Sequence, residues 1–484
     1  MAGLALPFLL PPIRDQQLEY TKYLNFLVAL TARRRNAIHV PSKPFDLSIN
    51  PSTACQLACP NCETGNGTMT RPATNLAPSL HSHMLAGVAD ELFIIRYFGT
   101  GESLLNKKFP ELMREIRGKE IFTFMTTNLS FRFTDKQIDD ILQSGINLIG
   151  VSLDGITQES YARYRVNGEH DLVVSNMRRL IERRDELGLQ YPLVEWRYLV
   201  FRHNEHEVET VRKLAQEYKV DLLEFAEGYA PRDDPAAPVQ RLEKFNVKQA
   251  MTGPALDAAT RAKNTVMRSM MMRQEFEHRL PPRQLKFRKC DWHYFSSYWY
   301  PDGGVGPCCI ATDISEDFGH ISMENSFADI WNGPQYSDAR ALFHKGSTSE
   351  SFCRSCRSKP TMDRFFITSV KGILLNAPSW VLKTLAQDTD RFFLPIDEYY
   401  LSNELKALRN FPRAYNGNFS DQVRHIRKLA ERNIVMEPHL KPLAELLETP
   451  LNLPRRTFND HLAETKGRIR LVMKKAKYAV NTLR

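Results

Sequence analysis

The chain has 484 residues, of which 42% are hydrophobic, 10% aromatic and 25% charged. This composition excludes a predominantly disordered protein, and the length predicts two or three domains. The net charge is +9, but seven basic residues and no acidic one lie between Lys466 and Arg484. The rest of the chain is nearly neutral, which argues against a nucleic-acid-binding domain, because such domains spread basic residues over a folded face.

The first residues predict neither a signal peptide nor a membrane span. The segment from Leu4 to Ile13 is apolar but short, is broken by prolines and lacks a basic start. No apolar run approaches the roughly 20 residues that cross a bilayer. We therefore expect a cytoplasmic protein whose residues 1–44 form a helical lead-in.

Six short apolar, β-branched or aromatic segments follow, and helical patterns separate most of them. The predicted strands are Phe45–Asn50, Glu91–Phe98, Ile121–Thr127, Asn147–Leu153, Val194–Phe201 and Asp221–Phe225. The predicted helices between them are Phe109–Arg117, Asp135–Ser144, Leu172–Leu187 and Glu205–Tyr218. This alternation predicts an α/β fold, a partial (β/α)6 TIM-like barrel over residues 45–230. In such barrels the chemistry gathers at the carboxyl ends of the strands.

Three of the eight cysteines lie close together directly after the first predicted strand. They are Cys55, Cys59 and Cys62, with the spacing CxxxCxxC. A large chain without a secretion signal favours metal or redox chemistry over disulfides, and thiolates favour zinc or iron–sulfur clusters. A structural zinc site needs a fourth ligand from elsewhere. Three thiolates that hold one cluster, with one iron left open, fit the count better.

This motif after a strand resembles the signature of the radical S-adenosylmethionine (radical SAM) enzymes. The resemblance implies that the three cysteines hold a [4Fe–4S] cluster and that S-adenosylmethionine binds its fourth iron. One electron from the cluster then cleaves a C–S bond and yields a 5′-deoxyadenosyl radical.

The polar residues after the second, third and fourth strands resemble the cofactor contacts of the same family. Two departures from the family's GGEP motif occur, because Thr100 and Ser103 replace its second glycine and its proline. Arg165 resembles the arginine that pairs with the methionine carboxylate, a task that suits a guanidinium. The residues that the resemblance implies as cofactor-binding are Gly99, Gly101, Glu102, Thr126, Asn128, Ser152, Asp154 and Arg165.

A second set of cysteines lies downstream, around a turn-rich segment from Tyr300 to Pro307 that predicts a hairpin. Its arrangement resembles a SPASM module in its shortened, twitch-like form with a single auxiliary [4Fe–4S] cluster, which implies two clusters per chain. The implied ligands are Cys290, Cys308, Cys353 and Cys356. Four thiolates would ligate every iron, so this cluster would move electrons or support the pocket. Cys309 is the spare: a small buried residue is favoured over an exchange with Cys308 or a hydrogen-atom donor.

The remaining chain divides around these motifs. Residues 231–285 predict a linker and a helical segment, residues 286–360 the auxiliary cluster domain, and residues 361–484 a mostly helical extension with a basic end. The basic helix predicts either contact with a membrane surface or an acidic partner, or a helix packed on the body.

We therefore predict a radical SAM oxidoreductase or maturase that abstracts a hydrogen atom from its substrate. The first hypothesis is a net oxidation, dehydrogenation of a sugar or polyol derivative, in which the auxiliary cluster accepts an electron. The alternatives are a maturase that modifies a peptide or protein side chain and a non-catalytic zinc-binding scaffold. The expected partners are a small-molecule or peptide substrate and a flavodoxin- or ferredoxin-type electron donor, with no nucleic acid. The sequence assigns no catalytic acid, base or hydrogen donor.

Overall fold

A computed structural model describes residues 10, 13–228, 237–242, 250–251, 290–342, 344 and 347–356, and scattered residues between 366 and 384. The chain divides into two compact units, Met1–Ala377 and Pro378–Arg484. The predicted linker helix and the basic helix at the end of the chain lie outside the described residues. Within the described part, no helix is both long enough and apolar enough to cross a membrane.

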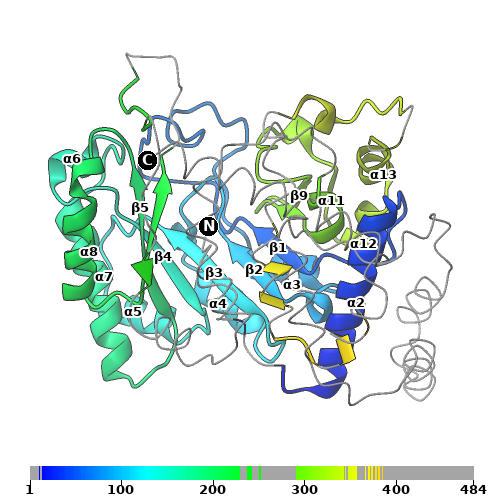
Figure 1. The fold of residues 1–484 in the computed structure, drawn as a ribbon, viewed down its shortest axis with the longest axis horizontal. Helices are drawn as coiled ribbons and strands as arrows, with labels where there is room; N and C mark the ends of the chain where they lie inside the picture. Colours follow the sequence, from blue (N-terminus) through cyan, green and yellow to red (C-terminus); the bar gives the residue numbers. More distant parts are fainter. Residues whose placement is uncertain are drawn as a thin grey trace, which may run out of the picture. The chain divides into compact units, whose positions relative to one another are not determined.

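Six parallel strands form the centre of the first unit, in the order of the sequence (Figure 1). They are β1 (Asp46–Ile49), β2 (Ile94–Tyr97), β3 (Phe122–Thr127), β4 (Leu148–Ser152), β5 (Leu193–Val200) and β6 (Leu222–Glu227). All six predicted strands are confirmed, with shifts at their ends. The largest shift is at β2, because Ala89–Glu91 forms a 3-10 turn instead of the start of the strand.

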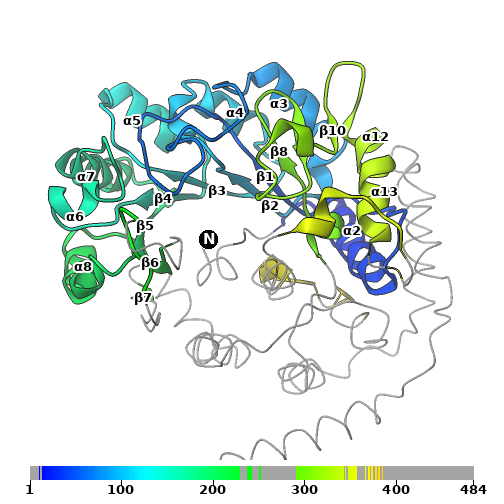
Figure 2. The ribbon, with the colours of Figure 1, turned by 90° about the horizontal axis from the view of Figure 1, so that it is seen from above.

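Helices connect these strands. They are α3 (Pro78–Leu85), α4 (Phe109–Glu115), α5 (Asp135–Leu142), α6 (Gln158–Ala162), α7 (His170–Glu186) and α8 (Val208–Glu217). Figure 2 shows the strands along an arc, with the connecting helices on its outer side. Thr134 begins α5 with a capping box, since its side chain accepts from the Gln137 backbone and Gln137 reaches back.

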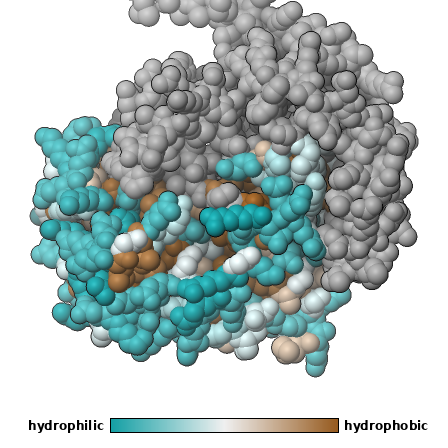
Figure 3. Space-filling model, turned by 90° about the horizontal axis from the view of Figure 1, so that it is seen from below, coloured by the Kyte–Doolittle hydropathy of each residue, from teal (hydrophilic) through white to brown (hydrophobic). Residues whose placement is uncertain are grey.

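Alternate strand residues face the helices and form the main core. Ile95, Met125, Ile149 and Trp196 belong to this cluster, together with apolar residues of the surrounding helices. Because side chains alternate along a strand, their neighbours in sequence point to the inner face of the arc. The face of the molecule drawn in Figure 3 is mostly hydrophilic, and hydrophobic residues gather in a central band on it.

The segment after residue 290 extends the same sheet, which the sequence did not predict. Its elements are α11 (Trp292–Phe295), β8 (Tyr298–Trp299), β9 (Gly304–Gly306), β10 (Gly319–His320), α12 (Phe327–Trp331) and α13 (Pro334–Ala341). Strands β8 and β9 form the predicted hairpin, and β8 pairs in parallel with β1. At the opposite edge, β7 (Ala250–Met251) pairs antiparallel with β6.

The lead-in helix α2 (Gln16–Arg35) begins at Asp15, whose side chain accepts from the Leu18 backbone N–H. Its last turn carries three arginines, whose positive charge is favourable at the carboxyl end of a helix. Arg33 is buried, and its Nε lies 2.5 Å from Oδ1 of Asp291, next to Cys290. The lead-in helix therefore holds the start of the downstream cysteine region.

Candidate functional site

Cys55, Cys59 and Cys62 lie together in the loop that follows β1. Cys59 is buried, and the other two are partly buried against the same small cluster of apolar side chains. The Cys62 N–H donates to the Cys59 carbonyl at 3.2 Å. A Cβ on Gly65 would lie 2.5 Å from the Cys59 backbone nitrogen, so the chain returns over the cysteines where only glycine fits.

Two N–H donors point at sulfur atoms of this loop. Nδ2 of Asn128 lies 3.7 Å from Sγ of Cys55, and a terminal nitrogen of Arg165 lies 3.9 Å from Sγ of Cys59. Burial raises the pKa of Cys55 to about 11, and it raises the pKa of Cys59 while Arg165 lowers it. Thiolates are the ligands of iron–sulfur clusters, so this donor set fits such a cluster, and ligation would release the thiol protons.

The loop after β2 lies against the cysteine loop because of two glycines. A Cβ on Gly101 would lie 2.0 Å from the Ser52 carbonyl oxygen, and one on Gly99 would lie 2.0 Å from the Tyr298 hydroxyl. The Glu102 N–H then donates to the Ala54 carbonyl at 2.8 Å. Gly101 therefore allows backbone contact with the cysteine loop, and Gly99 leaves room for the Tyr298 side chain.

The buried carboxylate of Glu102 joins two strand ends. It accepts from the Leu104 N–H at 3.0 Å, from Oγ1 of Thr127 at 2.7 Å and from the Asn128 N–H at 2.7 Å. Burial raises the pKa of Glu102, and these hydrogen bonds lower it. In this structure Glu102 thus fixes the loop after β3, which carries the Asn128 side chain to Cys55.

Asp154, which is buried, and Arg165, which is partly buried, form an ion pair beside the cysteines. Nε of Arg165 lies 2.6 Å from Oδ2 of Asp154, and Oδ1 of Asp154 accepts from the Leu199 N–H at 2.7 Å. Asp154 is fully buried, and both its oxygens are used within the protein. Its position is that of a residue which orients Arg165 toward Cys59.

Thr126 and Ser152 have a different surrounding from Asp154. Both are only partly buried at the ends of β3 and β4. Thr126 aligns with Gly150 of β4, so no side chain lies beside Thr126 on that neighbouring strand. These two hydroxyls and the Asn128 amide lie along neighbouring strand ends.

The second set of cysteines is more deeply buried. Cys290, Cys308 and Cys353 are each less than a tenth exposed, and Cys356 is partly buried. Burial raises the pKa of Cys290 and Cys308, and Cys353 raises both further through its own charge. Burial also raises the pKa of Cys353 to about 12, with a further contribution from Cys356. These effects link Cys290, Cys308 and Cys353 to one another, and they link Cys356 to Cys353 and to Cys309.

Cys309 lies within electrostatic reach of Cys308 and Cys356 and of Arg96 on β2. Burial raises its pKa to about 11, and Arg96 lowers it. Arg96 itself holds Asp46 through two hydrogen bonds of 2.8 and 2.6 Å. Among the described residues, no three His, Cys, Asp or Glu side chains are grouped around the position of a single metal ion.

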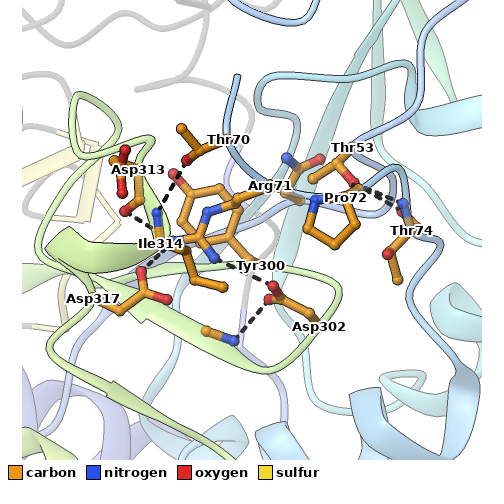
Figure 4. A network of polar contacts seen from close by, with 12 residues as sticks. Thr53, Thr70, Arg71, Pro72, Thr74, Tyr300, Asp302, Asp313, Ile314 and Asp317 are labelled. Carbon is orange, nitrogen blue, oxygen red and sulfur yellow. Dashed lines mark hydrogen bonds and ion pairs between the residues drawn. The ribbon is translucent and has the colours of Figure 1, made fainter. Parts of the chain in front are cut away.

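Arg71 connects the two cysteine regions, and nothing in the sequence marked it (Figure 4). Its side chain is fully buried and forms ion pairs with Asp302, at 3.3 Å, and with Asp317. Its guanidinium carbon lies 3.4 Å from the ring centre of Tyr300, an arrangement of cation and aromatic face. Arg71 belongs to the loop that follows Cys62, whereas all three partners belong to the segment around Cys308.

The same loop is tied to the start of the cysteine motif. Oγ1 of Thr53 donates to the Pro72 carbonyl at 2.7 Å and accepts from the Thr74 N–H at 2.8 Å (Figure 4). Thr53 stands two residues before Cys55. A continuous series of polar contacts thus runs from one cysteine region to the other through Arg71.

Comparison with known proteins places both regions in families. Residues 49–215 match the radical SAM superfamily, and residues 290–357 match the SPASM iron–sulfur cluster-binding domain. Radical SAM proteins with a SPASM domain are enzymes, so the non-catalytic zinc scaffold finds no support.

Several solved structures are similar to this chain at low identity. SuiB of Streptococcus suis bound to S-adenosylmethionine is 16% identical over 66% of this chain and 72% of that chain, with a TM-score of 0.45. BtrN in complex with AdoMet and 2-DOIA is 13% identical over 65% and 94%, with a TM-score of 0.34. Native anSMEcpe with bound AdoMet is 16% identical over 66% and 88%, with a TM-score of 0.40.

The two matches follow each other in the chain as the two cysteine regions do. The chain thus contains a radical SAM domain and a SPASM-type module, the two parts of an enzyme whose cofactors are [4Fe–4S] clusters and S-adenosylmethionine.

Proposed function

We propose that the enzyme removes a hydrogen atom from an unreactive carbon of its substrate and completes a net oxidation. In this proposal Cys55, Cys59 and Cys62 hold the cluster that binds S-adenosylmethionine. When bound, these two cofactors together supply a 5′-deoxyadenosyl radical, which takes the hydrogen atom.

The observation that carries the proposal is the grouping of three thiols at the carboxyl end of β1, with N–H donors directed at two of them. Asn128 and Arg165 are placed to donate to the sulfurs of Cys55 and Cys59. Hydrogen bonds to ligating sulfurs raise a cluster's potential and orient its ligands.

The residues around the thiols are assigned to S-adenosylmethionine as part of the same proposal. Gly99, Gly101 and Glu102 would offer backbone and carboxylate to its amino group. Thr126, Asn128 and Ser152 would face the ribose and the methionine part, and Asp154 would act through Arg165. The Arg165 guanidinium, fixed on one side by Asp154, would grip the carboxylate with its remaining N–H groups.

The second set completes the proposal. Cys290, Cys308, Cys353 and Cys356 would ligate an auxiliary [4Fe–4S] cluster at all four irons. A fully ligated cluster has no place for substrate and suits electron transfer, which a dehydrogenation requires. Loss of a hydrogen atom and then of one electron and one proton turns an alcohol carbon into a carbonyl.

A sugar or polyol derivative is therefore the first substrate class. A peptide or protein side chain remains the alternative, because the same hydrogen abstraction serves both. The proposal includes a cytoplasmic location and a flavodoxin- or ferredoxin-type electron donor, since thiolate-ligated clusters persist in reducing compartments.

The test is transfer of deuterium from labelled candidates into 5′-deoxyadenosine, measured by mass spectrometry on the anaerobically reconstituted enzyme. Deuterium from a ring carbon of a sugar or polyol, with a carbonyl product, supports the first class. Deuterium from a labelled peptide establishes the alternative. A reconstituted enzyme that binds about eight irons but forms no 5′-deoxyadenosine under reducing conditions would overturn both.

A further inference from the structure

A charged group lies on the inner face of the strand arc and has no role in the proposed cofactor site. Glu195 and Arg197 of β5 and Glu224 of β6 form it. Arg197 is aligned with Ser152 of β4 on one side and with Glu224 on the other. Glu195 precedes Arg197 by two residues on the same face of β5 and is aligned with Gly150 of β4. The group therefore lies on the same face of the sheet as Thr126 and Ser152, the strand-end residues assigned to S-adenosylmethionine, and in register with them.

The contacts within this group are unequal. Nε of Arg197 donates to Oε2 of Glu224 at 2.9 Å. The same nitrogen lies 3.7 Å from Oε2 of Glu195, beyond hydrogen-bond distance. Gly150 leaves the space for this arrangement, because a Cβ there would lie 2.7 Å from Cδ of Arg197 and 3.3 Å from Oε2 of Glu195.

One oxygen of the group is sealed from water without a hydrogen bond. Glu195 is 3% exposed, and its Oε2 has no hydrogen-bond partner in the part of the chain that the structure describes. Burial raises the pKa of Glu195, Glu224 raises it further, and Arg197 lowers it. A buried acceptor without a donor costs about 1–3 kcal/mol, so native proteins rarely keep one without a bound water, ion or other ligand.

The charges indicate which ligand would complete it. Among the described residues, two carboxyl groups face a single guanidinium, and the guanidinium is already engaged with Glu224. A cationic nitrogen group supplies both the missing donor and the missing positive charge, whereas an anionic group would meet two carboxylates. The side chains of Arg197 and Glu224 are 17% and 15% exposed, which leaves the group open on their side.

We propose that Glu195, with Arg197 and Glu224, forms a subsite that binds a cationic amino group of the substrate. The subsite rests on the proposed function, because it assigns the amine to the molecule that loses hydrogen. It narrows the substrate class to an amine-bearing molecule, such as an amino sugar or a peptide with a basic side chain.

The experiment measures the melting temperature of the full-length, cluster-loaded protein with methylammonium as the probe. Sodium at equal concentration controls for ionic strength. At about ten times a Kd of about 10 mM, we expect methylammonium to raise the melting temperature by about 2 °C over sodium. Glu195→Gln should lose most of this shift. Glu209→Gln removes an exposed carboxylate on α8 and should keep it.

A wild-type protein without the extra shift overturns the subsite. An equal shift in Glu195→Gln also does so, as does an equal loss in Glu209→Gln. Iron content and circular dichroism establish that each variant is folded and loaded. Failure of the proposed function appears separately, as absent 5′-deoxyadenosine formation by the wild-type enzyme, because the melting shift requires no turnover.

Discussion

The two cysteine regions of this molecule differ in how they are enclosed. The first lies in a loop at the carboxyl end of β1, where two of three thiols are only partly buried and side chains from neighbouring strand ends surround them. The second is enclosed, with three buried cysteines and with Tyr298, Tyr300 and Tyr336 all buried nearby. This difference supports the proposal that the first region admits a cofactor and substrate and that the second exchanges only electrons.

The largest expected effect comes from removing the ligands of each region in turn. Replacing Cys55, Cys59 and Cys62 together with Ala should abolish 5′-deoxyadenosine formation and leave about four irons per chain. Replacing Cys290, Cys353 and Cys356 should also leave about four irons, but S-adenosylmethionine cleavage without substrate should continue. Iron analysis and chromatography of the nucleoside provide the measurements. Cleavage by the first triple variant would contradict the assignment of that region.

The next effect concerns Arg165, which belongs to the open region. Arg165→Ala should weaken S-adenosylmethionine binding by about 2 kcal/mol, or roughly 30-fold in Kd, because a charge-assisted hydrogen bond is lost. Iron content should stay the same. Arg165→Lys keeps the charge but not the forked geometry, so its affinity for S-adenosylmethionine should lie between those of the wild type and Arg165→Ala. Equilibrium dialysis gives the affinities, and loss of iron in Arg165→Ala would point instead to a structural role.

A third prediction concerns Arg71, whose ion pairs connect the two cysteine regions. Arg71→Ala leaves two aspartates without their buried partner and should destabilise the fold by about 3 kcal/mol. The pKa of Asp317 is raised from its ordinary value of 3.8 to about 6, mainly by burial, while Arg71 lowers it. Without Arg71 the unpaired carboxylate is more costly once it is ionised. The loss of melting temperature should therefore be larger at pH 8 than at pH 5.

The double variant Arg71→Ala/Asp317→Asn is the matched test of this explanation. It removes the buried carboxylate together with its partner, so it should regain part of the stability and lose the dependence on pH. A loss that stays the same at both pH values and in the double variant would show that Arg71 acts only through its packing on Tyr300.

The smallest expected effect is at the spare cysteine. Cys309→Ser should leave the iron content unchanged and shift the melting temperature by only a few degrees, because Cys290, Cys308, Cys353 and Cys356 already supply four ligands in the proposal. Cys308→Ser is the matched variant and should lose about four irons. The reverse pattern, with iron lost only from Cys309→Ser, would exchange the two assignments.

Local patterns predicted the strands and both cysteine motifs well. The spacing of Cys55, Cys59 and Cys62 and the alternation of segments such as Ile121–Thr127 depend on neighbours in the chain. The pairing of β8 with β1 was not predictable, because it joins residues about 250 positions apart that carry no local signal. The role of Arg71 was not predictable for the same reason, because its partners belong to a distant segment of the chain.

The roles of the charged strand-end residues were also beyond the sequence. Glu102 and Asp154 were placed as cofactor contacts by resemblance, whereas the structure shows what each already holds within the protein. Glu102 joins two loops, and Asp154 orients Arg165. Whether a carboxylate forms hydrogen bonds within its own chain depends on partners from other strands, which only the folded structure brings together.

The most direct test of the central claim is electron paramagnetic resonance of the anaerobically reduced protein, with and without S-adenosylmethionine. The account predicts signals from two [4Fe–4S] clusters, of which one changes on addition of S-adenosylmethionine and is missing from the variant without Cys55, Cys59 and Cys62. A reduced, iron-loaded protein in which no cluster signal responds to S-adenosylmethionine would contradict it.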